Sequence, residues 1–265
     1  MTVIPALVPP TPKQNAWTRN IPPSAAFGWL AAGWRDMTID PMQSLAYGLL
    51  VFFVSIAVVA GLVFLGWDFI LFPAFAGFMI VGPLLALGLY EKSRRLAAGE
   101  RVSLAQMIFV RPQSGGQFLF TGVLLCLLVL LWMRAAVIVY ALFFGLQPFP
   151  GLEHVAAMLF TTPVGLAMLL VGGAIGGLFA AFSFAISAFS IPMQLNERVD
   201  ALTAMGSSVA LVWNNLPVML VWGTIVLVLF LFSLVTGMLA LVVVFPAIGH
   251  GTWHAYEAIR APKQS

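Results

Sequence analysis

Charged side chains are scarce in this sequence. Asp, Glu, Lys and Arg make up 8% of its 265 residues, whereas hydrophobic residues make up 62%. A soluble domain carries roughly 25% charged residues and folds around one core. The apolar runs here are long enough to cross a bilayer, which takes about 20 residues each. The composition therefore excludes an ordinary soluble protein and predicts an all-α membrane protein that crosses the lipid bilayer several times.

Residues that carry chemistry are also few. The single cysteine, Cys126, lies within an apolar run, so an internal disulfide and a CxxC metal site are excluded. The sequence has no phosphate-binding glycine loop, no GxSxG or HExxH motif, and no nucleophile beside a base. Its three histidines are too few for the core of a haem–copper oxidase. We therefore expect a protein that is not an enzyme, and we predict no cofactor.

The apolar runs predict six membrane spans. A tail of residues 1–41, proline-rich and ending in an interfacial helix, precedes a transmembrane domain of residues 42–257, and residues 258–265 form a second tail. The six spans are predicted at residues 45–66, 69–90, 118–141, 163–191, 216–234 and 238–256.

The basic residues predict the orientation. Eleven of the twelve Lys and Arg residues lie in the two tails or in the loops after the second and fourth spans, and the twelfth, Arg134, lies inside the third span. Because Lys and Arg are retained on the cytoplasmic side, both termini are predicted to be cytoplasmic. Since the basic residues sit beside spans, we do not expect a nucleic-acid partner.

A weak internal repeat has two interpretations. Three times an amphipathic segment on the cytoplasmic side precedes a pair of spans, and two of these segments follow the short sequences Glu100-Arg101-Val102 and Glu197-Arg198-Val199. This pattern predicts three units of one interfacial helix plus a helical hairpin. The alternative is that any six-span protein with cytoplasmic loops shows such a pattern by chance.

Three sequence blocks carry a resemblance to a known family. They are GPLLALGLYEKSRRLAAGE at 82–100, SIPMQLNERVDALTAM at 190–205 and GHGTWHAYEAI at 249–259. The chain from about residue 34 to 260 resembles a bacterial family of uncharacterised integral membrane proteins with a domain of unknown function. Some members of that family are labelled cytochrome c oxidase subunits. The resemblance implies the six-span architecture and a respiratory association, and it supplies no catalytic residues.

One group of side chains has the spacing of a metal site. His250, His254 and Glu257 are spaced i, i+4 and i+7, which places them on one helix face. Two imidazoles and a carboxylate are a plausible ligand set for a transition metal. The alternative is that both imidazoles hydrogen-bond carbonyl groups or lipid headgroups within an interfacial aromatic belt.

Arg134 is the one charge inside a span, and such residues face protein or water. We predict that it reaches the outer interface and pairs with Asp68 or Glu153. An ion or proton path and an anionic-lipid contact are the alternatives.

Two further groups have structural interpretations. Gly172, Gly173, Gly176 and Gly177 form two overlapping small-xxx-small pairs, which are predicted to pack against a neighbouring helix of this chain or of a partner. Arg94 and Arg95, beside the second span, are the expected contacts for anionic lipid headgroups.

Three functions remain from this pattern. The first is a non-catalytic accessory or scaffold subunit of an inner-membrane assembly, such as a respiratory or photosynthetic complex, with other membrane subunits as partners. The second is a small-solute or ion transporter or channel, although ionisable residues within the spans are too few for a typical carrier. The third is a metal or haem protein that uses His250 and His254.

Overall fold

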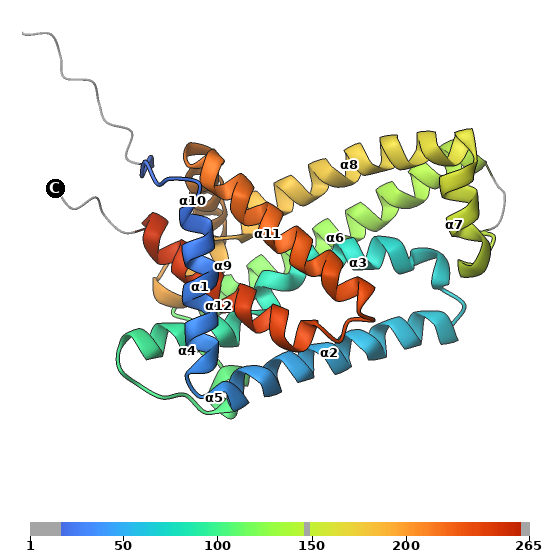
Figure 1. Cartoon of the computed structure of the whole chain (residues 1–265). Helices are drawn as coiled ribbons and strands as arrows, with labels where there is room; N and C mark the ends of the chain where they lie inside the picture. The colour runs from blue at the N-terminus through green and yellow to red at the C-terminus, as the bar shows by residue number, and fades with distance from the viewer. Residues whose placement is uncertain (1–16, 146–148, 261–265) are drawn as a thin grey trace, which may run out of the picture.

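The structure, a computed structural model, describes residues 17–145 and 149–260, and every regular element in these ranges is helical (Figure 1). The proline-rich part of the predicted N-terminal tail before residue 17, and residues 261–265 of the predicted C-terminal tail, lie outside the described residues. The elements are α1 (Ala25–Thr38), α2 (Pro41–Phe64), η1 (Asp68–Ile70), α3 (Leu71–Leu85), α4 (Leu87–Ala97), α5 (Leu104–Ile108), α6 (Gly115–Phe144), α7 (Leu152–Thr161), α8 (Pro163–Ser187), α9 (Ser190–Asn196), α10 (Ala201–Asn214), α11 (Leu216–Val235) and α12 (Leu241–Arg260).

Five helical segments in the described ranges are long and apolar enough to cross a membrane. They are Pro41–Phe64, Asp68–Ala97, Gly115–Phe144, Pro163–Asn196 and Leu216–Val235, which overlap the first five predicted spans. The multi-pass, all-helical class is thereby confirmed. α12, the predicted sixth span, is not among the five. Its apolar part, residues 241–248, is only about 12 Å long at 1.5 Å per residue, and a polar half follows it.

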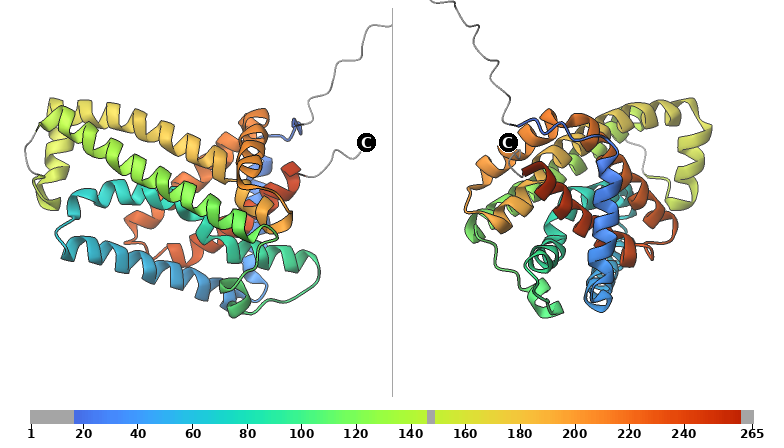
Figure 2. Two further views of the ribbon diagram at one scale, coloured as in Figure 1. Left: turned by 180° about the vertical axis from the view of Figure 1, so that it is seen from behind. Right: turned by 60° about the vertical axis from the view of Figure 1, so that its left-hand side comes forward.

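The two described ends of the chain lie on the same side of the bundle. α1 lies across the end of the long helices and packs against α12 (Figures 1 and 2). In addition, Arg19 Nε donates a hydrogen bond to the carbonyl oxygen of Ile259 at 2.6 Å. When two points of a chain lie on the same side of a bilayer, the chain between them crosses the bilayer an even number of times. Six crossings therefore stay the prediction, with α12 returning the chain.

Apart from α7, which is an additional helix in the second unit, the helix order follows the predicted threefold arrangement, which stays a prediction. Each unit has a short helix at the end of the bundle that carries most of the Lys and Arg residues, here called the Lys/Arg-rich end, followed by an outgoing long helix and a returning helix. The first unit is α1, α2 and α3–α4, the second is α5, α6 and α8–α9, and the third is α10, α11 and α12. Each returning helix contains a proline in its body or in its continuation, namely Pro83, Pro192 and Pro246. Proline removes a backbone hydrogen bond and bends a helix. α3 accordingly ends at Leu85 before α4 begins, and α8 ends at Ser187 before α9.

The returning helix of one unit packs on the next unit. α4 contacts α5 and α3 contacts α6, α9 contacts α10, and α12 contacts both α1 and α2. Glycines permit the closest of these approaches, because an absent side chain lets two backbones meet. A Cβ atom at Gly33 of α1 would lie 2.5 Å from the carbonyl oxygen of Ala247 on α12. The α1–α2–α12 assembly is therefore held at backbone contact, and it carries the polar side chains described next.

Candidate polar site at the Lys/Arg-rich end

Among the lysine and arginine side chains of the described residues, Lys92 is the most deeply buried, with only 1% of its surface exposed. Its ammonium group donates to the carbonyl oxygens of Ile39 and Asp40, at 2.6 and 3.0 Å, and to Ser44 Oγ at 2.7 Å. All three N–H donors of the group are therefore used. The two carbonyls belong to the turn between α1 and α2, where Asp40 has a left-handed backbone (φ 50°). Lys92 thus ties α4 to the start of α2.

His250 continues the network from Ser44 toward α1. Its Nε2 lies 3.0 Å from Ser44 Oγ and its Nδ1 lies 2.8 Å from Ser93 Oγ. Ser93 donates its only proton to Asp36 Oδ2 at 2.6 Å, so its oxygen accepts from His250 Nδ1–H. Ser44, which accepts from Lys92, is then free to donate to Nε2. These partners assign the neutral Nδ1–H tautomer to His250.

Asp36 is the anionic end of this network. Besides Ser93 it accepts a hydrogen bond from His254 Nε2 at 2.8 Å. Burial alone opposes ionisation of this carboxyl group, but the hydrogen bonds from His254 and Ser93 outweigh it and lower the pKa of Asp36. A continuous chain of hydrogen bonds therefore runs from the ammonium of Lys92 to the carboxylate of Asp36. It joins α1, α2, α4 and α12, and both of its ends lie at the Lys/Arg-rich end of the bundle.

A second cluster joins α9 to the end of α12. Arg260 pairs with Glu197 at 3.0 Å, and the hydroxyl of Tyr256 donates to the same carboxylate at 2.7 Å. The hydrogen bond from Arg260, assisted by that from Tyr256, lowers the pKa of Glu197 below its ordinary value. Glu197 belongs to one of the two Glu-Arg-Val sequences. In the other sequence, the carboxylate of Glu100 lies 3.9 Å from the guanidinium group of Arg95.

This cluster predicts a modest acid sensitivity. Because the folded-state pKa of Glu197 is depressed, its contribution to stability is present above the unfolded value, near 4.5, and is lost as pH falls through the folded value. Since the pair is about one-third exposed, we expect a contribution of roughly 1 kcal/mol or less. Thermal unfolding in detergent between pH 6 and 3 measures it. Glu197→Gln should flatten the acid limb of the stability curve, whereas Glu100→Gln should leave it; equal curves for wild type and Glu197→Gln contradict the assignment.

The predicted metal ligands are not brought together as a ligand set. Both ring nitrogens of His250 face serine hydroxyls, and His254 Nε2 faces Asp36. Among the residues that the structure describes, no group of three or more His, Cys, Asp or Glu side chains is placed to hold a metal ion. Although the two imidazoles lie on one face of α12, each forms hydrogen bonds with side chains of neighbouring helices, so they do not face a common metal position.

The predicted ion pair of Arg134 is absent from the described residues. No carboxylate there lies within ion-pair distance of Arg134, and neither Asp68 nor Glu153 pairs with it. The side chain is on the exposed surface of α6. Sequence order placed these three groups near one end of the bundle, but it did not determine the rotation of α6, which turns Arg134 outward.

The four glycines of α8 divide into two faces. A Cβ atom at Gly172 would lie 3.5 Å from Val139, and one at Gly176 would lie 3.0 Å from Trp132, so these two glycines face α6. Gly173 and Gly177 meet nothing within 4 Å. One small-xxx-small pair is therefore packed within the chain and the other is open.

Arg94 and Arg95, the predicted lipid contacts, both pair with Glu91 on their own helix. About a third of each side chain stays exposed. The ion pairs hold the two guanidinium groups beside Glu91, and lipid binding by them stays a prediction.

Sequence reasoning missed Lys92, Ser93 and Ser44 as parts of one site. Lys92 lies close to Arg94 and Arg95 in the sequence, which gives it the pattern of a basic loop. Its partner Ser44 lies 48 positions away, and Ser93 meets His250 over 157 positions. The local signal was a lysine close to the end of an apolar run, which basic loops also show.

Comparison with known proteins adds a family and no activity. Residues 71–196, from the first residue of α3 to the last of α9, match the family model described as "Predicted integral membrane protein (DUF2189)". No curated protein and no solved structure matches the chain. The match confirms the resemblance to an uncharacterised family of integral membrane proteins.

Proposed function

We propose that this integral membrane protein, which matches a family of predicted integral membrane proteins over residues 71–196, is a non-catalytic scaffold subunit. Its partner is a transmembrane helix of another subunit in a bacterial inner-membrane assembly. Respiratory or photosynthetic complexes are the assemblies that the sequence analysis indicates.

The poor burial of α8 within the chain supports this proposal. Only 6% of the apolar window of the segment Pro163–Asn196 is buried, against 28% for Leu216–Val235. Gly173 and Gly177 lie one turn apart on its open side. A flexible lipid chain packs against a helix surface with or without glycine, whereas the backbone of a second helix approaches closely only where small residues such as this pair are present. The open side of α8 therefore suits a helix of a partner subunit.

The packing at the Lys/Arg-rich end also fits a scaffold. The Lys92–Asp36 network and the glycine contacts hold α1, α2, α4 and α12 together. Their geometry fixes helix positions, which is what an accessory subunit offers its assembly.

Affinity purification in a gentle detergent tests the scaffold function. We expect stoichiometric membrane subunits with the wild-type chain and their loss, about tenfold or more, when Gly173 and Gly177 are both replaced by leucine. Thermal unfolding of the variant checks that the fold is retained, because these side chains enter open space. A double Gly→Leu variant that keeps every partner, or a wild-type chain purified alone or as a homo-oligomer, contradicts the proposal.

The orientation is proposed with both termini in the cytoplasm. The two described ends share one side, and the basic residues gather there. A fluorescent protein that matures only in the cytoplasm, fused after residue 265, should fluoresce. An exported alkaline phosphatase fused at the same point should be inactive, and the reverse result overturns the orientation.

A small-solute or ion transporter is the second candidate. The threefold helix order with a proline in each returning segment favours it, because bent helices can open and close a path. A purified chain without partner subunits would place this candidate first.

A further inference from the structure

One of the three equivalent contacts between a returning helix and an outgoing helix is loosely packed. The returning helix α3 packs on the next outgoing helix, α6, and α12 packs on α2. The equivalent pair, α8 and α11, is not among the closely packed pairs of the described residues. The two helices approach where the ring of Phe184 lies beside Gly223. Apart from this contact, a space remains between α8 and α11.

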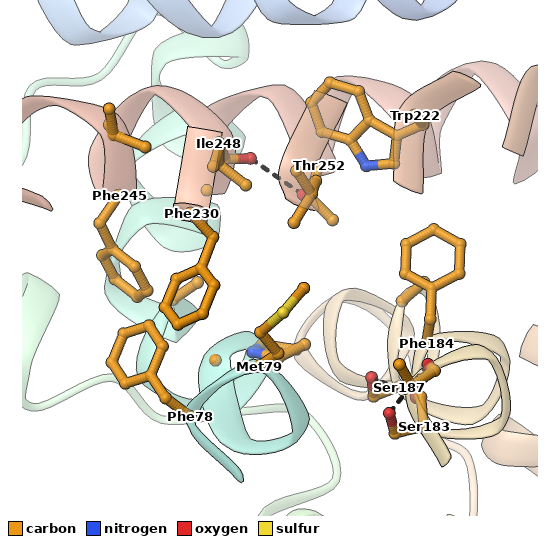
Figure 3. A pocket seen from close by; sticks show the side chains of 18 of the residues that line it. Phe78, Met79, Ser183, Phe184, Ser187, Trp222, Phe230, Phe245, Ile248 and Thr252 are labelled. Carbon is orange, nitrogen blue, oxygen red and sulfur yellow. Dashed lines mark hydrogen bonds between the residues drawn. The ribbon is translucent and has the colours of Figure 1, made fainter. Parts of the chain in front are cut away.

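A cavity of about 110 Å³ occupies this space, bordered by α3, α8, α11 and α12. Figure 3 shows Phe78, Phe230 and Phe245 gathered at one end, with Trp222, Thr252 and Phe184 toward the other. Phe78 stacks on Phe230 with ring centroids 5.5 Å apart. The aromatic rings close one end of the cavity, and Ala180, an exposed residue of α8, lies in its wall. The cavity therefore reaches the lipid-facing surface of the bundle.

Three of the four hydroxyl groups in the wall donate their protons to backbone carbonyls of the chain, and the fourth belongs to the buried Tyr90. Ser187 donates to the carbonyl oxygen of Ser183 at 2.7 Å, Ser183 donates to that of Ala180 at 3.0 Å, and Thr252 donates to that of Ile248 at 2.9 Å. An ordered water needs two to four polar partners, and cavities of similar size lined by apolar side chains stay dry and take apolar guests. The wall consequently favours hydrocarbon over water or a polar solute.

We propose that this cavity binds the end of an acyl chain of a membrane lipid, which enters between α8 and α11. Ala180 of α8 is exposed and Val226 of α11 is partly exposed, and both lie in the cavity wall. Bilayer hydrocarbon is thus continuous with the cavity. The chain end fills the α8–α11 contact that the other units make directly. This site uses different residues from the open glycine face of α8 and is independent of the scaffold function.

Gly82 provides a variant that fills the cavity. It lines the wall on α3, and a Cβ atom added to it meets nothing within 4 Å, so Gly82→Leu places a side chain in the open space. Gly61 of α2 is the matched control, because it too has nothing within 4 Å but lies away from the cavity. Ala180→Phe fills the same space from α8.

Photolabelling tests the proposal. The full chain is placed in vesicles of a phosphatidylcholine whose acyl chain ends in a diazirine, and labelled residues are identified by mass spectrometry. Trp222 is 1% exposed and reports the cavity, while Leu178, 72% exposed, reports surrounding lipid. We expect labelled Trp222 in wild type and Gly61→Leu, and about tenfold less label relative to Leu178 in Gly82→Leu.

Ala180→Phe should give the same loss if Gly82→Leu fails the thermal-unfolding check. Trp222 that stays unlabelled in wild type, or labelling that is equal in wild type and a folded filled variant, overturns the proposal.

Discussion

Replacing Lys92 with methionine is expected to lower the free energy of unfolding by about 3 kcal/mol, because buried backbone carbonyl groups are left without a hydrogen-bond donor. Methionine keeps much of the length of the lysine side chain but donates no hydrogen bond. The carbonyl oxygens of Ile39 and Asp40 then lose the ammonium group that now lies 2.6 and 3.0 Å away. For a chain of this size the loss corresponds to a fall in Tm of roughly 10 °C, measured by thermal unfolding in detergent.

Arg101 gives the matched control for this change. It also interacts with Asp40, at 3.4 Å, but its side chain is 83% exposed. An exposed ion pair contributes at most about 1 kcal/mol, so Arg101→Met should move Tm by only a degree or two. If the two variants lose equal stability, the buried network does not hold the α1–α2 turn as described.

Gly48→Ala should destabilise the protein by about 2–3 kcal/mol, the cost of overpacking a close contact. The added Cβ atom would overlap the carbonyl oxygen of Val242 on α12 and lie 2.9 Å from Pro246 Cγ. A backbone carbonyl cannot move aside by changing rotamer. The α2–α12 crossing must therefore separate, which weakens the packing that returns the chain to the Lys/Arg-rich end.

Gly61→Ala on the same helix should have the opposite sign. Nothing lies within 4 Å of its added Cβ atom, and replacing glycine by alanine inside a helix gains about 0.5–1 kcal/mol. Thermal unfolding of the two variants side by side separates helix propensity from helix contact. Stabilisation by both substitutions would show that α2 and α12 do not meet at Gly48.

The membrane class and five of the long helices were predictable from sequence. A bilayer rewards length and apolarity, and both are properties of consecutive residues, so Pro41–Phe64 or Gly115–Phe144 can be found without any tertiary contact. The cap of α10 is also a local feature, because Asp200 accepts a hydrogen bond from the backbone of Thr203, three residues away.

The candidate site was predictable only in part. His250, His254 and Glu257 were singled out as metal ligands on one helix face, and the two histidines lie in the polar network. Their chemistry was not predictable, since a metal site requires the two imidazoles to face a common point, and helix rotation gives each a different partner.

The helix repeat and the four glycines of α8 were also predictable only in part. Periodicity places Gly172 and Gly176 on one face and Gly173 and Gly177 beside it, but it does not say which pair meets α6.

Sequence by itself therefore determined that this chain is an all-helical membrane protein, where its long helices lie and which end is rich in basic residues, because these depend on local composition. The tertiary structure decided that Lys92 is buried, that His250 bridges two serines, that Arg134 faces outward and that a cavity separates α8 from α11. Each of these depends on how helices far apart in sequence are rotated against one another, and that rotation is set by the packing of the whole bundle.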